Sequence, residues 1–178
     1  MIKIGIKVFF VYTLYAMIQY YFTSGYVIVI IPAMLPLLLY IKEETQKLKG
    51  IDIIRYLIFY LIIIWIITQV FTNTNITNVK ENMNVYVYFS VIIISPIWEE
   101  LIFRKYLYYD MQRYIGDLLA MGISAILFIL IHKPNTINDT IRYLIPTIFL
   151  IYTYKKSEYD LKVPVIIHMF NNLISVIT

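Results

Sequence analysis

The sequence contains no cysteine, which excludes disulfide bonds, cysteine-ligated zinc and thiol nucleophiles. Charged residues are also scarce, at 15% of the chain. A soluble domain of this size carries about 25% charged residues, so this chain has too little charged surface to cover a water-exposed globule. Because cysteine is absent, any catalysis must use carboxylates, imidazoles or hydroxyls.

Apolar residues make up 61% of the 178 residues, and the mean hydropathy is +0.74. Because a membrane-spanning helix needs about 20 apolar residues, we expect an all-α, polytopic transmembrane helical bundle that forms a single membrane domain. Within it, residues 1–84 carry no recognised motif, whereas the notable polar residues lie in 85–178. Seven candidate spans are predicted, at residues 4–22, 25–41, 53–71, 85–103, 118–132, 141–154 and 163–177.

Lys and Arg residues are distributed unevenly between alternate loops. With a cytoplasmic N-terminus, the opposite side receives only Lys80, Lys133 and Arg142. Because cytoplasmic loops are enriched in Lys and Arg, we predict this orientation, with the C-terminus outside. The same bias accounts for the net charge of +4, so the lipid bilayer is an expected partner and nucleic acid is not.

Tyrosines are abundant, with 18 in the chain. An amphipathic ring prefers the headgroup level of a membrane. Residues such as Tyr106, Tyr108 and Tyr109 are therefore expected in interfacial belts, and they carry little evidence of function.

An acidic pair interrupts the end of the fourth predicted span, where ionisable residues are costly and usually functional. Successive helical residues lie about 100° apart, so Glu100 and Arg104 share a face and are predicted to pair. Glu99 points elsewhere and is free to do chemistry. The alternative is a charged patch near the membrane surface with an ordinary helical ion pair.

The two histidines of the chain both lie in apolar helices. His132 ends an apolar run, one turn after Phe128, and either serves a site or interacts with the helix dipole. His168 shares a face with Asn172 in the last span, and this pair either serves the same site or joins helices by hydrogen bonds.

A depth comparison indicates whether these residues can meet. If the fourth helix continues to a turn at 115–116, Glu99 and His132 both lie roughly 24 Å from that turn, and Glu99 and His168 both lie about 8 Å below the cytoplasmic side. This predicts a cavity inside the membrane that faces the cytoplasm. It requires the fifth helix to stop partway across, near Pro134, where a broken helix is tolerated if it lines a cavity.

Three motifs occur in order: Glu-Glu-x-x-x-Arg at 99–104, Phe-x-x-x-His at 128–132 and His-x-x-x-Asn at 168–172. Together they resemble the CPBP family of intramembrane proteases, also called Abi proteins, which contains CAAX-prenyl-protein endopeptidases and bacteriocin-processing enzymes. The resemblance covers about residues 90–178 and includes Leu161-x-x-Pro164 and the Asn171-Asn172 pair. Lys105 stands where the family often has glycine, which concerns packing more than chemistry.

The resemblance implies a role for each matching residue. Glu99 and His132 would activate water, and His168 with Asn172 would bind or polarise the scissile carbonyl. Glu100 and Arg104 would shape the site, with Phe128 as a supporting residue. The cofactor is either none or a divalent metal such as Zn²⁺, which Glu99, His132 and His168 would then bind at an open three-ligand site.

The expected function is therefore an intramembrane endopeptidase that acts on a membrane-associated peptide or protein. The Ile-, Lys-, Asn- and Tyr-rich composition suggests an AT-rich bacterial genome and a bacterial cell membrane, where bacteriocin or peptide maturation or self-immunity is expected rather than cleavage of prenylated proteins. Two alternatives remain open. One is a non-catalytic membrane immunity or scaffold protein. The other is an ion-coupled carrier, against which the lack of an inverted repeat counts.

Overall fold

The computed structural model describes residues 5, 8, 9, 11–16, 20, 50–70 and 85–177, and these residues form helices and short turns without a strand. The predicted span 25–41 lies outside the described residues. The described residues of the first predicted span, 4–22, are all helical. The remaining elements are α4 (Gly50–Val70), α5 (Val85–Phe89), η3 (Ser90–Ile94), α6 (Ser95–Glu100), η4 (Leu101–Tyr109), α7 (Asp110–Ile115), α8 (Asp117–Ile131), α9 (Ile137–Lys156) and α10 (Lys162–Ile177).

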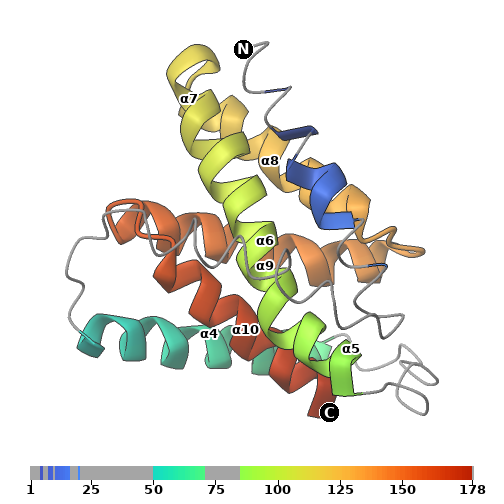
Figure 1. The fold of residues 1–178 in the computed structure, drawn as a ribbon. Helices are drawn as coiled ribbons and strands as arrows, with labels where there is room; N and C mark the ends of the chain where they lie inside the picture. The colour runs from blue at the N-terminus through green and yellow to red at the C-terminus, as the bar shows by residue number, and fades with distance from the viewer. Residues whose placement is uncertain are drawn as a thin grey trace.

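Five of these elements, α5 through α7, form one continuous helix over Val85–Ile115, in which η3 and η4 are π-helical. The helix continues past the predicted span 85–103, as the depth comparison requires, and Arg104 is buried inside the protein. The helix stops at Gly116, and α8 runs back along its α7 end (Figure 1). The predicted turn at 115–116 is confirmed.

The end of α8 also agrees with the prediction. The helix ends at Ile131 with His132 as its C-cap, and Lys133 follows in the left-handed region with a φ of 48°. Pro134 comes next and cannot continue a helix. His132 is therefore presented at a helix end.

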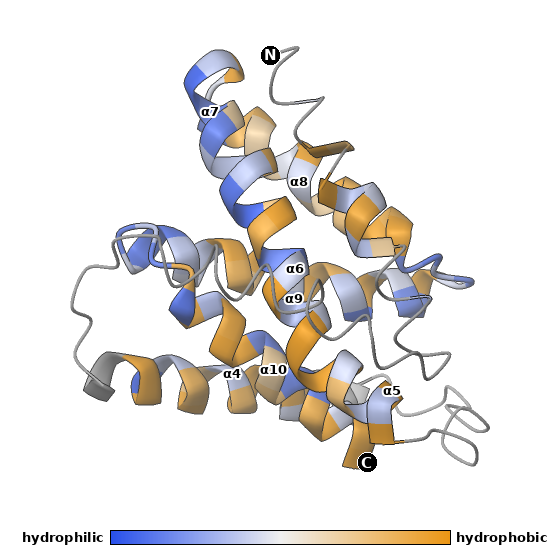
Figure 2. Cartoon of the chain, in the orientation of Figure 1, coloured by the Kyte–Doolittle hydropathy of each residue, from blue (hydrophilic) through white to orange (hydrophobic). Residues whose placement is uncertain are grey.

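Among the described residues, Val85–Ile115 is the one helix that is long and apolar enough to cross a membrane. Shorter apolar helical stretches occur at Ile53–Ile66, Asp117–Ile131 and Lys162–Ile177. The all-helical class is confirmed, but the number of seven spans stays a prediction. Figure 2 shows largely apolar residues along α4 and α10 and hydrophilic residues at the α7 end of the helical hairpin.

The other helices surround the long helix. The α8 helix packs against η4, while α10 crosses α6 and η3 (Figure 1). The α9 helix contacts α8 and α10, and α4 contacts α9 and α10. As a result, the middle of the long helix, where the acidic pair lies, is enclosed by elements that carry the two histidines.

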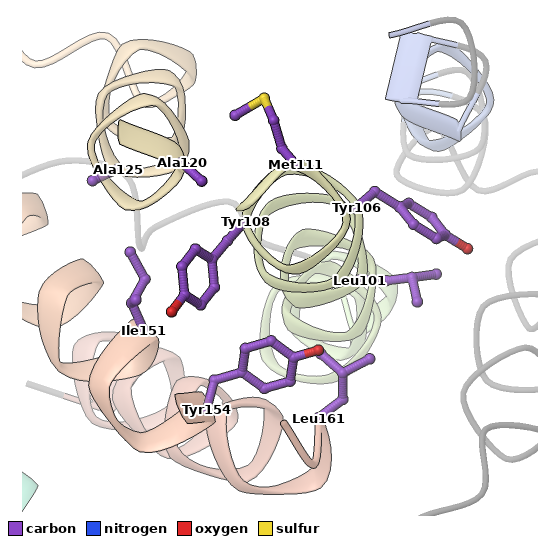
Figure 3. Packing of buried hydrophobic residues seen from close by; sticks show 9 residues of the cluster. All are labelled: Leu101, Tyr106, Tyr108, Met111, Ala120, Ala125, Ile151, Tyr154 and Leu161. Atoms are coloured by element: carbon purple, nitrogen blue, oxygen red, sulfur yellow. The ribbon is translucent and has the colours of Figure 1, made fainter. Parts of the chain in front are cut away.

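A buried aromatic cluster holds α9 against the hairpin (Figure 3). Tyr108 is fully buried between α8 and α9, next to Ile151 and Tyr154, and its hydroxyl donates a 2.7 Å hydrogen bond to Asp117 Oδ1. The small side chain of Ala120 faces this cluster and allows α8 to approach closely. The expected interfacial position is wrong for Tyr108, because its ring packs inside the protein.

Candidate active site

Glu100 lies at the centre of a fully buried ionic group. Its Oε2 is 2.9 Å from Arg104 Nε, and both side chains are inaccessible to solvent. The pairing predicted from the four-residue spacing is confirmed. The other oxygen, Oε1, accepts a 2.8 Å hydrogen bond from His168 Nδ1, a partner from α10 that the spacing could not reveal. Glu100 is thus held on both of its oxygens.

Phe128 on α8 supplies an apolar surface beneath these groups. The Arg104 guanidinium carbon lies 4.7 Å from the centre of its ring, a distance at which a cation is attracted to the ring face. The His132 ring lies 4.6 Å and the His168 ring 5.9 Å from the Phe128 ring, measured between centroids. Phe128 therefore contacts three of the predicted site residues, as expected of a supporting residue.

Glu99 is also buried, but its Oε2 has no hydrogen-bond partner. This oxygen lies 3.9 Å from His132 Nε2 and 3.7 Å from His168 Nε2. These distances are too long for direct hydrogen bonds. Two imidazole nitrogens, one from α10 and one from the C-cap of α8, thus lie within 4 Å of one carboxylate oxygen on α6, and the structure brings together the glutamate and both histidines that the motifs predicted.

The other ring nitrogens determine what the two imidazoles present. His132 Nδ1 lies 2.8 Å from the Phe128 carbonyl oxygen, which can only accept, so Nδ1 carries the proton. His168 Nδ1 donates to the Glu100 carboxylate in the same way. In the neutral tautomers, both Nε2 atoms are therefore acceptors that face Glu99 Oε2. A small molecule with two O–H donors matches this arrangement.

Two tyrosines at the site were missed by the sequence analysis. The Tyr15 hydroxyl donates a 3.3 Å hydrogen bond to Glu99 Oε1. The Tyr143 ring on α9 stacks on His132, with 4.7 Å between centroids and 37° between the ring planes. The sequence gives no local signal for them, because the chain has 18 tyrosines and these two contact Glu99 and His132 from other helices.

Asn172 lies on the same α10 face as His168, but its amide is directed at the long helix. Its Nδ2 donates a 2.9 Å hydrogen bond to the carbonyl oxygen of Val91. In η3 the Ser95 N–H bonds to the Ser90 carbonyl, five residues back. The next donor in this register would be Pro96, which has no N–H. Asn172 thus supplies a hydrogen bond where the backbone cannot.

The neighbouring Asn171 connects this region to α4. Its Oδ1 accepts a 2.8 Å hydrogen bond from the Tyr60 hydroxyl, and its Nδ2 donates to Asn172 Oδ1 at 3.2 Å. Tyr60 is fully buried against Phe149. The asparagine pair therefore links α4, α10 and the proline-containing part of the long helix.

The residues do not fit a metal site in this geometry. Glu99, His132 and His168 have the donor types that zinc prefers. However, within the described part of the chain, no three His, Asp or Glu side chains are arranged so that they could hold a metal ion.

A family model described as type II CAAX prenyl endopeptidase Rce1-like matches residues 81–174, just over half of the chain. The chain belongs to this family. The match contains both glutamates and both histidines of the site, whereas Tyr15 and Tyr60 lie outside it. No curated protein and no solved structure matches the chain.

The Rce1-like family is a family of membrane-integral proteases, so this protein is a CAAX-type intramembrane protease in the general sense. A protease of this kind acts on a peptide or protein in a membrane context. The reaction type predicted from the three motifs is thereby confirmed, while the roles of single residues stay predictions.

Proposed function

We propose that the protein hydrolyses a peptide bond of a membrane-associated peptide or protein with water activated by Glu99 and His132. The convergence of Glu99 Oε2 with two imidazole Nε2 atoms, at 3.7 and 3.9 Å, carries this proposal. Glu99 Oε2 and His132 Nε2 are then the acceptors for a water molecule, which donates one proton to each, while His168 is protonated and directs its Nε2–H toward Glu99 Oε2. Peptide hydrolysis requires such an activated water.

The proposed reaction proceeds in two steps. Glu99 takes a proton from the water as its oxygen adds to the scissile carbonyl carbon, and the carbonyl oxygen becomes an oxyanion. Protonated His168 Nε2 and the second N–H of Asn172 donate to this oxyanion, which is the usual source of most stabilisation in acyl transfer. The proton held by Glu99 then passes to the leaving amine as the C–N bond breaks.

Arg104 and Glu100 prepare this centre without touching the substrate. Glu100 holds Nδ1 of His168, so Nε2 points toward Glu99. Arg104 lies between the Glu100 carboxylate and the Phe128 ring, which fixes the carboxylate in turn. A preorganised site of this kind avoids reorganisation during the reaction.

We propose that the substrate reaches the site from the cytoplasmic side, through the cavity that the depth comparison predicts. The biological role is maturation of a bacteriocin or another peptide, or self-immunity. The composition typical of an AT-rich bacterial genome supports this role over cleavage of prenylated proteins.

The test compares peptide ends in membranes of cells that express the wild type or a variant, by N-terminal labelling and mass spectrometry. We expect a set of ends that requires the wild type and is absent with Glu99→Ala, His132→Ala and His168→Ala. Glu158→Gln, in an exposed turn, is the matched control and should give the wild-type set. Identical ends in wild-type and all three alanine samples would refute the proposal.

A second arm concerns metal. Purified protein is incubated with a strong chelator and assayed on a peptide that carries the cleavage site found in the membranes. We expect unchanged activity, because the proposed mechanism uses only carboxylate, imidazole and amide groups. Loss of activity that Zn²⁺ restores would assign a metallopeptidase mechanism instead.

A further inference from the structure

We infer that Tyr15 is a positioning residue for Glu99, so that the segment 11–16, outside the family match, completes the active site. The inference rests on the proposed role of Glu99 as the base. It goes beyond that proposal because it assigns a function to the N-terminal part of the chain, where no motif was found.

The Glu99 carboxylate has two oxygens in different surroundings. Oε1 accepts a hydrogen bond from the Tyr15 hydroxyl at 3.3 Å, and Oε2 faces the two imidazoles. A carboxylate can rotate about its last carbon–carbon bond. Holding one oxygen therefore determines where the other one points, and here it points to the predicted position of the water.

The Tyr15 ring is itself held in place. It packs on the ring of Trp98, the residue before Glu99, with 5.8 Å between ring centroids. It also makes an edge contact with the Tyr12 ring. Val8 and Val11 pack on the same apolar cluster, which contains Trp98 and Phe128. Ser95, one turn before Glu99, is another hydrogen-bond partner of the Tyr15 hydroxyl. The hydroxyl is thus fixed between two residues of α6.

Tyr15→Phe removes the hydroxyl and keeps the ring that packs on Trp98. Tyr12→Phe removes a hydroxyl from the same helical segment, one turn earlier, and is the matched control. Both full-length variants are assayed in liposomes on an internally quenched peptide that carries the cleavage site found in the membrane comparison. The values of kcat, KM and the thermal midpoint are measured for each.

We expect Tyr15→Phe to lower kcat about tenfold, the effect of losing a hydrogen bond to a charged group, with KM and thermal midpoint unchanged. Tyr12→Phe should match the wild type. In the Glu99→Ala background, Tyr15→Phe should lower the residual rate no further, because the carboxylate that it orients is gone. Because the rates are expressed per folded molecule, this comparison holds even if Tyr15→Phe accumulates less well.

Wild-type kcat for Tyr15→Phe, together with inactive Glu99→Gln, would overturn this inference and leave the proposed function intact. An equal loss for Tyr12→Phe, or a further tenfold loss in the Glu99→Ala background, would also overturn it, because the hydroxyl would then act through general packing. If Glu99→Gln retains full activity, the proposed function itself fails.

Discussion

Two adjacent glutamates on one short helix occupy different surroundings. Glu100 is fully buried, and its oxygens contact Arg104 and His168. Glu99 has one oxygen on Tyr15 and one that faces two imidazoles without a direct hydrogen bond. Residue type is the same at both positions, so only their neighbours distinguish Glu100 from Glu99, the carboxylate proposed to act as the base.

This difference predicts opposite outcomes for two equivalent substitutions. Glu100→Gln removes the charge that compensates a buried Arg104, and an uncompensated buried charge costs roughly 3–5 kcal/mol. We expect low abundance and a lowered thermal midpoint for this variant. Glu99→Gln should keep wild-type abundance and lose activity by a factor on the order of 10²–10⁴, as for a general base. Abundance, thermal midpoint and peptide cleavage are measured side by side.

The reverse pattern, with an unstable Glu99→Gln and a stable but inactive Glu100→Gln, would exchange the two roles. It would mean that the 100° spacing argument does not hold on this helix. Arg104→Met provides a matched control, because it removes the other charge of the pair and should destabilise the protein as Glu100→Gln does.

At this scale, the sequence predicts contacts within a helix better than contacts between helices. The pair of Glu100 and Arg104 follows from a spacing of four residues. The contact between Glu100 and His168 joins residues 68 positions apart and depends on how α10 crosses α6. The Tyr15 contact spans 84 positions and involves one of many tyrosines. Neither can be derived from local spacing.

The long helix shows how a single element changes register around the site. Two π-helical segments, η3 and η4, flank α6, which carries the acidic pair. π-Helical turns are frequently found at functional sites. Pro96 accounts for part of this, because it cannot donate to a carbonyl of the preceding turn. Asn172 donates to Val91 instead, so an asparagine proposed to bind substrate also stabilises the helix that carries Glu99.

The helical hairpin depends on the conformation of one residue. Gly116 has φ 85° and ψ 162°, a region that is essentially restricted to glycine and costs other residues roughly 1–3 kcal/mol. A Cβ at this position would meet no atom within 4 Å. The requirement for glycine is therefore conformational and not steric.

Gly116→Ala and Gly122→Ala form a matched pair of substitutions. Gly116→Ala should lower the free energy of unfolding by about 1–3 kcal/mol. Gly122 lies inside α8 with open space for a Cβ, so Gly122→Ala should raise stability by up to about 1 kcal/mol through helix propensity. Thermal or denaturant unfolding of both variants in the same detergent tests this. Equal effects of the two changes would contradict the account of the turn.

The extents of the elements were predicted with mixed success, for identifiable reasons. The apolar runs placed α8 and α10 within about one residue at each end, because each run is bounded by a turn or by polar residues. The helix that contains the fourth predicted span continues past Arg104, whose charge is neutralised inside the protein, to the predicted turn at 115–116. The apolar pattern does not indicate the π-helical segments η3 and η4. Pro96 is the one sequence feature that relates to them.

On the scale of the whole molecule, contacts tie the hairpin tip to the end of α9. Asp117, at the start of α8, forms an ion pair with Lys155, in the last turn of α9. The hydrogen bond from Lys155, and then that from Tyr108, lowers the pKa of the Asp117 carboxyl from its ordinary value. Lys155 therefore lies beside the start of α8, next to the turn of the hairpin. The Lys and Arg count predicts that Arg113 and Lys155 lie on the cytoplasmic side.

The absence of cysteine allows the predicted orientation to be tested with single introduced thiols. Helix α10 has 16 residues and a length of about 24 Å, slightly less than the roughly 30 Å hydrocarbon core. Lys156→Cys is at the end of α9, just before the turn that leads into α10 and on the predicted cytoplasmic side, and Ile177→Cys is at the exposed end of α10, on the predicted outer side. A membrane-impermeant maleimide should label Ile177→Cys in intact cells, and Lys156→Cys only after permeabilisation. Because the wild type has no thiol, its labelling is the background.

Each other result has a defined meaning. Labelling of Lys156→Cys alone in intact cells would reverse the orientation and place the site nearer the outer face. Labelling of both thiols in intact cells would mean that α10 does not cross the membrane, against the prediction of a final span at 163–177. Substrate access would change accordingly, because His168 lies near the start of α10 and its depth follows the side on which that helix begins.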